Sequence, residues 1–135
     1  MSAPRQPRAP VLLPPALDVG YDVDEFGRPT VTAVVNLGDD YQGPPGSVHG
    51  GYLAAIFDSL LGVLPYRLTG SKGTFTGRLT VRYRSLTPLS TDLVLTGKVT
   101  DARSRRVTAA GQCHADGVLT AEAEGLFVRP ATDRR

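Results

Sequence analysis

One short segment in the middle of the chain has a glycine-rich loop at its start and a single carboxylate at its end. From Gly43 to Asp58 the sequence reads G-P-P-G-S-V-H-G-G-Y-L-A-A-I-F-D, a Gly/Pro loop that leads through a histidine into an apolar segment with one carboxylate. Free N–H groups at a helix start, with the positive end of the helix dipole, stabilise a carbonyl oxygen that gains negative charge. A carboxylate serves as a base or nucleophile. Gly50, Gly51 and Asp58 are therefore candidate groups for acyl transfer.

Asp58 has two interpretations. It lies between Phe57 and Leu60 in a segment that is apolar on nearly every side, and a buried carboxylate is costly unless it is paired, hydrogen-bonded or protonated. In the first interpretation it lies on one solvated stripe of the helix, beside Ser59 and Gly62. In the second it is a functional carboxylate. The glycine-rich loop before the helix favours the second interpretation.

The spacing of Gly50 and Asp58 prevents both from acting on one carbon within one chain. Eight helical residues separate them, and a rise of ~1.5 Å per residue puts them about 12 Å apart along the axis. If two copies of the helix lie antiparallel across a two-fold axis, Asp58 of one copy faces Gly50 of the other. We therefore expect a homodimer with two composite sites.

Composition sets the limits within which such a site must be built. The 135 residues are 41% hydrophobic and 21% charged, as expected for one compact domain. A formal charge of +2 gives no support for a nucleic-acid partner. The single cysteine, Cys113, excludes an intramolecular disulfide, and with two histidines a Cys/His metal site is not expected.

The ends of the chain differ from its middle. The first sixteen residues contain five prolines, and we expect a flexible arm over 1–16, a single domain over 17–130 and a short tail over 131–135. There is no apolar run of ~18 residues and no hydrophobic region for a signal peptide. The sequence thus predicts a cytoplasmic protein that does not bind membranes.

Hydrophobic periodicity predicts an α+β fold. Five or six strands alternate with period two, and the helix is apolar on nearly every side, which favours a long curved antiparallel sheet wrapped around one central helix. Hairpin-like links between the later strands favour a meander, although the pattern does not fix strand order. Pro65 and Gly70 are expected to end the helix. The expected strands are Thr30–Leu37, paired with Leu17–Val23, then Thr74–Leu86, Asp92–Ala102, Arg106–Ala115 and Val118–Val128, and the expected helix is Tyr52–Leu64.

Three motifs together resemble a known family. The His-Gly-Gly loop followed by Asp58, the pattern T-x-x-L-x-V-x-Y from Thr76 to Tyr83, and the later T-P-L at Thr87 to Leu89 are similar to hotdog-fold acyl-CoA thioesterases. The similarity is greatest to the branch that contains the phenylacetate-pathway thioesterase and its animal relatives. It covers roughly Asp39 to Pro130. The resemblance implies the hotdog fold, a homodimer and often a dimer of dimers.

The resemblance also implies roles for individual residues. Gly50 would donate its N–H to the thioester carbonyl, and Asp58 of the partner chain would be the base or nucleophile. Thr76 would orient the hydrolytic water or Asp58. His49 would shape the loop and help to hold the thioester. Gln42 is the nearest candidate for a second group that polarises the carbonyl.

The substrate would be an acyl-CoA, with CoA as part of the substrate and no separate cofactor. Gly51 would lie close to it, and Phe57 and Leu61 would line either a medium fatty-acyl tunnel or an aryl slot. Arg103, Arg105 and Arg106 cluster between two strands and would either bind the CoA phosphates or be ordinary solvated arginines. Arg82 and Arg84 are expected to be solvated on the outer sheet face.

Three functions remain open on this basis. The leading one is an acyl-CoA thioesterase. The second is a non-catalytic module that binds acyl-CoA or acyl-carrier protein in a hotdog pocket. A hotdog dehydratase is a weaker third, because such an enzyme needs a histidine and a carboxylate as an acid/base pair, and His49 lies at the loop tip.

Overall fold

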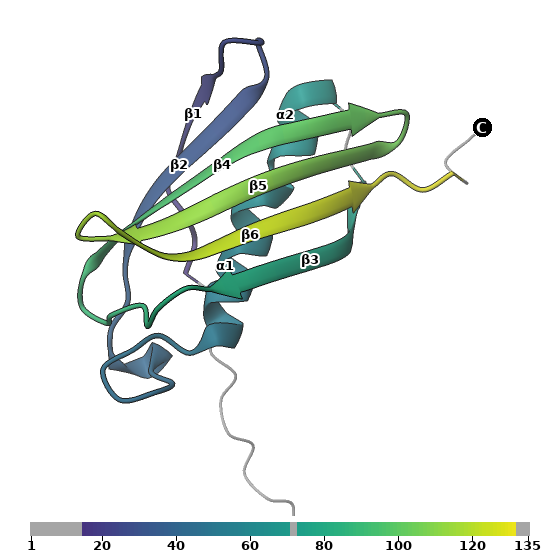
Figure 1. Cartoon of the computed structure of the whole chain (residues 1–135). Coiled ribbons are helices and arrows are strands. Elements are labelled where there is room, and N and C mark those ends of the chain that lie inside the picture. The colour runs from purple at the N-terminus through teal and green to yellow at the C-terminus, as the bar shows by residue number, and fades with distance from the viewer. Residues whose placement is uncertain (1–14, 71–72, 132–135) are drawn as a thin grey trace, which may run out of the picture.

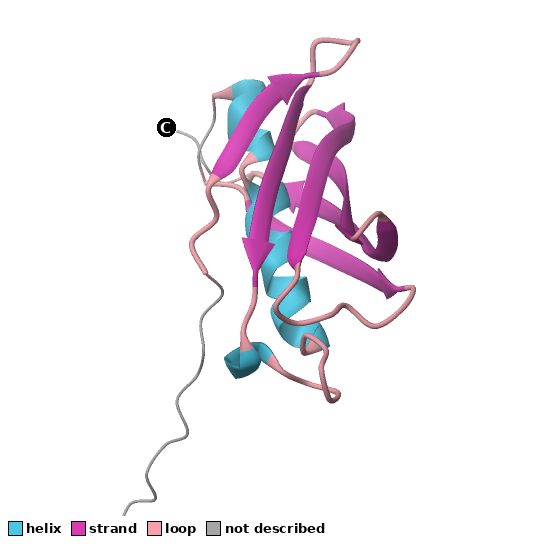
Figure 2. Ribbon diagram, turned by 90° about the vertical axis from the view of Figure 1, so that its left-hand side faces the viewer, coloured by secondary structure: helices cyan, strands magenta, loops and turns pink. Residues whose placement is uncertain are grey.

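A six-stranded antiparallel sheet curves around one long helix in the computed structural model, which describes residues 15–70 and 73–131 (Figure 1). The strand order is β1-β2-β4-β5-β6-β3, and the helix lies against one face of the sheet (Figure 2). The α+β architecture predicted from the sequence is confirmed. The arm expected over 1–16 and the tail over 131–135 lie mostly outside the described residues. The strands are β1 (Val19–Val23), β2 (Pro29–Asn36), β3 (Phe75–Tyr83), β4 (Asp92–Arg103), β5 (Arg106–Ala115) and β6 (Val118–Val128).

Period-two alternation locates the strands well. Strands β5 and β6 have the predicted bounds, and β4 extends one residue further. Strand β3 is shorter than the predicted Thr74–Leu86 because the chain turns away after Tyr83, where the N–H groups of Arg84 and Ser85 both donate to the carbonyl of Thr120. The link between β1 and β2 is a turn in which the Asp24 carboxylate accepts from the N–H groups of Phe26 and Arg28.

The expected meander is only partly correct. Strands β4, β5 and β6 do follow one another, but β3 pairs with β6, and β2 pairs with β4. The chain therefore leaves β2 at one side of the sheet, passes through the helical segment and returns as the opposite edge strand. Alternation shows which side chains face the core, whereas it carries no information about which strands are neighbours.

The helical segment consists of two helices, α1 (Gly50–Gly62) and α2 (Leu64–Thr69), with a 3-10 turn, η1 (Asp39–Tyr41), before them. The expectation that Pro65 ends the helix is wrong. Pro65 lies in the first turn of α2, where its missing N–H is not needed. Gly70 does end α2, with a φ of +73° in the left-handed region.

One face of α1 packs against the sheet, and the opposite stripe is open in the single chain. The buried face carries Leu53, Ile56, Phe57, Leu60 and Leu61, whereas Gly51 and Ser59 are exposed and Asp58 is half-buried. The sequence had indicated burial on nearly every side. The difference has a physical basis, because one sheet covers only one side of a helix and the other side needs a second surface.

Two glycines let α1 approach the sheet closely. Gly97 and Gly111 are opposite each other on β4 and β5. A Cβ on Gly97 would lie 2.7 Å from Leu61 Cδ2, and a Cβ on Gly111 would lie 3.2 Å from both Leu61 and Phe57. Full burial of the Leu61 and Phe57 side chains stabilises the fold by roughly 1.5–3 kcal/mol each. The contact fixes the rotation of α1, and with it the direction of Asp58.

No helix in the part of the chain that the structure describes is both long and apolar enough to cross a membrane.

Candidate active site

The N–H of Gly50 is a free hydrogen-bond donor at the start of α1. Gly50 is the first helical residue, and its N–H has no acceptor among residues 15–70 and 73–131. The carbonyl of the preceding residue, His49, accepts from the N–H groups of Tyr52 and Leu53 at 3.1 and 3.2 Å. The His49–Gly50 peptide is thus held at its oxygen while its nitrogen remains available. A backbone N–H that is fixed and unpaired in this way can donate to an oxyanion.

The side chain of His49 caps the helix. Its Nδ1 accepts from the N–H of Gly51 at 3.0 Å, and its ring lies edge-on to Tyr52, with 5.5 Å between centroids. An Nδ1 that accepts implies a neutral ring with its proton on Nε2. The Gly51 N–H, a candidate for substrate binding from the sequence, is therefore already bonded within the chain. Of the two glycines, only Gly50 offers its N–H.

Tyr83, at the end of β3, holds the carbonyl of Gly50. Its hydroxyl donates to the Gly50 oxygen at 2.6 Å. Its ring also occupies the space beside Gly50, since a Cβ there would lie 3.3 Å from ring atom Cζ. Burial raises the pKa of the Tyr83 hydroxyl above its ordinary value. Gly50 is consequently fixed by neighbours on both flanking peptides.

The Gly/Pro loop is a compact turn that delivers His49 to the helix. The Gln42 side-chain oxygen accepts from the N–H of Gly46 at 2.9 Å, and Gly46 has a φ of +75° that favours glycine. A Cβ on Gly43 would lie 2.7 Å from the Cα of His49, so only glycine allows this approach. Because the oxygen of Gln42 holds the loop, its NH₂ group is the end that remains for a substrate.

Asp58 is hydrogen-bonded to Thr76, which is one of the two roles that the family resemblance implied for Thr76. The Thr76 hydroxyl donates to Asp58 Oδ1 at 2.7 Å. Within the described residues, Asp58 forms no ion pair. The second carboxylate oxygen thus has no assigned partner and is available to a water molecule or a substrate.

A β-bulge at Gly77 turns Thr76 toward the helix. Thr76 is opposite Phe127 of β6, and Arg78 is opposite the adjacent Leu126, so Gly77 is an extra residue in β3. Phe127 is a core residue, and directly opposed residues face the same side of a sheet. If Gly77 were paired in a regular ladder, it would be opposite Phe127, and Thr76 would face away from Asp58. Sequence reasoning missed Gly77, although an isolated glycine in a strand pattern is a known signal for a bulge.

The Gly50 and Asp58 groups remain separate in one chain. Both belong to the single uninterrupted helix α1, which keeps them about 12 Å apart along its axis. Gly50 is held from the end of β3 by Tyr83, and Asp58 is held from its start by Thr76.

Phe57 and Leu61, expected to line an acyl pocket, are core residues. Both are 0% exposed and pack beneath Gly97 and Gly111. They face the sheet because the close approach of α1 directs that side of the helix inward. On α1 itself, the open stripe is the part that remains accessible to a ligand in the single chain.

The arginine cluster forms the β4–β5 hairpin, near α2. Arg103 pairs with Asp101 at 3.0 Å, and Arg105 Nε donates to the carbonyl of Arg129 at 3.1 Å. A small cavity of about 20 Å³ brings Arg105 beside Pro65 and Thr74, close in sequence to Thr76. The cluster, which also contains Arg106, therefore lies toward the Asp58–Thr76 half of the site.

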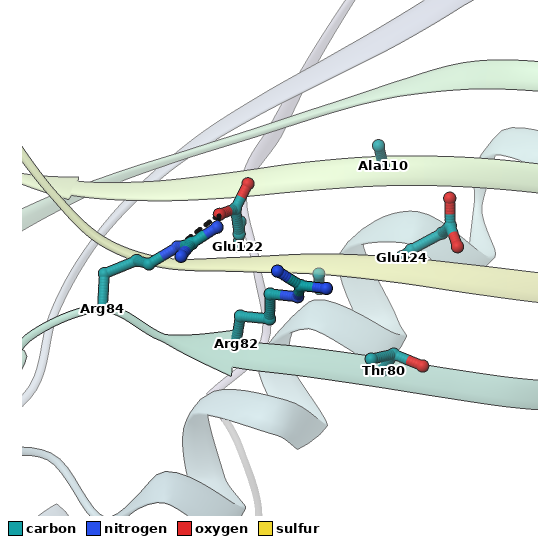
Figure 3. A pocket seen from close by; sticks show the side chains of 7 residues that line it. Thr80, Arg82, Arg84, Ala110, Glu122 and Glu124 are labelled. Carbon is teal, nitrogen blue, oxygen red and sulfur yellow. Dashed lines mark hydrogen bonds and ion pairs between the residues drawn. The ribbon is translucent and has the colours of Figure 1, made fainter.

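The outer sheet face has a cavity of about 280 Å³ that contains none of the candidate catalytic residues (Figure 3). Arg84 forms an ion pair there with Glu122, and Arg82 stands beside it. These side chains lie on the face of the sheet away from α1, as expected for solvated arginines.

Comparisons with known proteins agree with this architecture. The family model of the thioesterase superfamily matches residues 45–122. The acyl-coenzyme A thioesterase THEM4 of Xenopus laevis is 36% identical over 116 residues, which are 82% of this chain and 51% of that protein. The chain spans about half the length of the curated relatives it matches.

Solved structures show the same fold. A crystal structure of a thioesterase superfamily protein has a TM-score of 0.69 and 40% identity, and covers 82% of this chain and 55% of that one. The PaaI protein of the E. coli phenylacetic acid degradation operon has a TM-score of 0.71 at 13% identity, over 84% and 82% of the two chains. The resemblance seen in the sequence motifs is confirmed. This chain belongs to the thioesterase superfamily and has its hotdog fold.

Proposed function

We propose that the chain is an acyl-CoA thioesterase that acts through composite sites in a homodimer. The observation that carries the proposal is the pair of prepared groups on α1, which are the free N–H of Gly50 and the carboxylate of Asp58 bonded to Thr76. The relationship to an acyl-CoA thioesterase supports the substrate class.

In the proposed reaction the Gly50 N–H donates to the thioester carbonyl oxygen and stabilises the negative charge that forms there. Such a donor commonly lowers the activation barrier by about 2.7–4 kcal/mol. Gln42 is positioned in the same loop, and its NH₂ group is a second candidate donor. His49 supports the donor by capping the helix and does not act as the base.

Asp58 has two possible roles in the chemical step. As a general base it removes a proton from water, whose oxygen attacks the carbonyl carbon, and the C–S bond breaks to give the acid and the CoA thiol. As a nucleophile its oxygen forms an anhydride with the acyl group while CoA leaves, and water then hydrolyses the anhydride. Thr76 orients either the water or Asp58. The reaction requires no cofactor other than the CoA of the substrate.

The open edge of the sheet supports the dimer. Strand β3 is an edge strand of nine residues, with Phe75 52% and Tyr83 51% exposed. An unpaired edge of this length is normally covered. Pairing of two β3 strands about a two-fold axis would place the open stripes of the two α1 helices near each other. Asp58 of one chain would then reach Gly50 of the other, and such dimers could pair again into a tetramer.

The arginine hairpin is the proposed site for the CoA phosphates. The hairpin would serve the composite site to which its own chain gives Asp58 and Thr76, and the position of Arg105 beside Thr74 and α2 supports this. Guanidinium groups match phosphate oxygens in geometry as well as charge. Arg103 and Arg106 are opposite each other in the β4–β5 ladder, so the backbone of the cluster is fixed.

The proposal is tested by thiol release from short, medium, long and aromatic acyl-CoAs. Wild type is expected to release CoA from at least one class, and Asp58→Asn is expected to lose about 10²- to 10⁴-fold in kcat with its oligomeric state intact. Asp116→Asn is a matched control because Asp116 has a positive φ in the β5–β6 turn, a conformation that Asn also adopts. Acyl-CoA binding without turnover of any substrate would instead identify a non-catalytic acyl-binding module.

A further inference from the structure

Gly50 needs external support if its N–H is to keep one direction. Glycine has more backbone freedom than any other residue, and an oxyanion donor is effective only when it is fixed before the reaction. The peptide before Gly50 is held through the His49 carbonyl, and the next peptide is held at the Gly51 N–H by His49 Nδ1. The oxygen of that second peptide is held by Tyr83 at 2.6 Å.

Tyr83 differs from the other two supports because it comes from outside the loop and helix. Tyr83 is the last residue of β3, and its side chain lies on the face of the sheet that α1 packs against. Thr80 and Arg82 of the same strand line the cavity on the opposite face (Figure 3). Its ring packs against Gly50, where a Cβ would lie 3.3 Å from ring atom Cζ. The rigid sheet is thereby connected directly to the donor residue.

We propose that Tyr83 is a positioning residue that fixes the Gly50 N–H for the oxyanion through its hydrogen bond to the Gly50 carbonyl. This inference rests on the proposed function of Gly50. The hydroxyl is suited to the task because it is protonated at neutral pH, since its ordinary pKa of 10.0 lies well above neutrality and partial desolvation raises it further. Tyr83 acts through Gly50 and does not itself contact the reacting atoms.

The kinetic test is Tyr83→Phe, which removes the hydroxyl and keeps the ring against Gly50. Loss of one neutral hydrogen bond is expected to lower kcat about 5- to 10-fold. KM should stay within about 2-fold, because the oxyanion contact is made chiefly in the transition state. Tyr21→Phe is the matched control, since it removes a hydroxyl from β1 at the other edge of the sheet. It should leave both constants unchanged.

A second measurement does not depend on turnover. In ¹⁵N NMR spectra of the dimer, the Gly50 amide resonance should shift or broaden in Tyr83→Phe and stay in place in Tyr21→Phe. If wild type hydrolyses no acyl-CoA, the proposed function fails, and this measurement still tests the contact. An unchanged Gly50 resonance would overturn the proposal. So would a raised KM with normal kcat, which would indicate that Tyr83 binds substrate directly.

Discussion

Gly50 offers a way to delete one backbone donor while the helix is kept. It is the first residue of α1, where proline is well tolerated, and His49 before it has φ −62° and ψ 130°, which suits a residue that precedes proline. Gly50→Pro therefore removes the N–H at a position whose local backbone accepts the change. We expect kcat for thioester hydrolysis to fall about 10²- to 10³-fold, as for loss of an oxyanion donor.

The control for this substitution is Gly50→Ala. Its Cβ meets the Tyr83 ring at 3.3 Å, as the Cβ of proline would, but its N–H is retained. The difference in kcat between the two variants isolates the contribution of the donor from that of crowding. Equal kcat values for the proline and alanine variants would show that the Gly50 N–H is not the oxyanion donor.

Cys113 is predicted to be chemically inert in the native protein. It is 0% exposed, and burial raises the pKa of its thiol above the ordinary value of 9.0, an effect that the Thr120 hydroxyl partly offsets. Native protein at pH 7.5 should therefore resist alkylation by a thiol reagent, while unfolded protein should react. Rapid labelling of the native protein would contradict the burial.

The same shift in the pKa of Cys113 makes stability depend on pH. A thiol whose pKa is raised by folding loses its proton first in the unfolded chain, so its contribution is complete below pH 9.0 and is lost as the pH rises through the folded pKa. Urea titrations should give a lower free energy of unfolding at pH 10 than at pH 8. Cys113→Ala should reduce this difference.

Among the elements, β3 has the greatest influence on the site, and its bulge can be tested separately. Gly77→Val places a β-branched residue where a Cβ would lie 3.1 Å from Val128 Cγ2, and valine favours regular pairing. If the first residues of β3 shift to regular register, Thr76 turns away from Asp58. Loss of that bond should lower kcat about 10- to 100-fold, as expected for a hydrogen bond to a charged group.

Deletion of Gly77 is the matched control for this bulge. It removes the extra residue, so Thr76 stays opposite Phe127 in a regular ladder and keeps facing the helix. The deletion variant should keep kcat within about 5-fold of wild type, because the Thr76–Asp58 bond, which as a hydrogen bond to a charged group is worth roughly 1.5–3 kcal/mol, is retained. If the deletion variant lost as much kcat as Gly77→Val, catalysis would depend on the bulge itself and not on the direction of Thr76.

At the scale of the whole molecule, composite sites predict complementation between two inactive chains. A dimer of one Asp58→Asn chain and one Gly50→Pro chain has one site with both groups intact and one site with neither. Random mixing makes half of the dimers mixed, so activity should recover to about a quarter of wild type. Measurement requires co-refolding or co-expression, with each variant alone as control. No recovery in a mixed dimer demonstrated by mass would place both groups of each site in the same chain.

Several features of this protein follow from its sequence because they depend on local periodicity and residue type. The alternation of apolar residues gave the bounds of β5 and β6, and the apolar run gave α1 to within two residues at each end. The family resemblance implied that Thr76 orients either the hydrolytic water or Asp58, and in the structure the Thr76 hydroxyl donates to Asp58.

The tertiary structure alone decided what depends on contacts between distant segments. Strand β3 lies beside β6 because the chain crosses the sheet through α1, and no periodicity encodes a neighbour. Gly97 and Gly111 draw α1 inward and so make Phe57 and Leu61 core residues. Tyr83 reaches Gly50, 33 residues away in sequence, because β3 ends beside the start of α1. Sequence spacing indicates the groups proposed to do chemistry, whereas packing between distant strands and the helix fixes the direction in which those groups point.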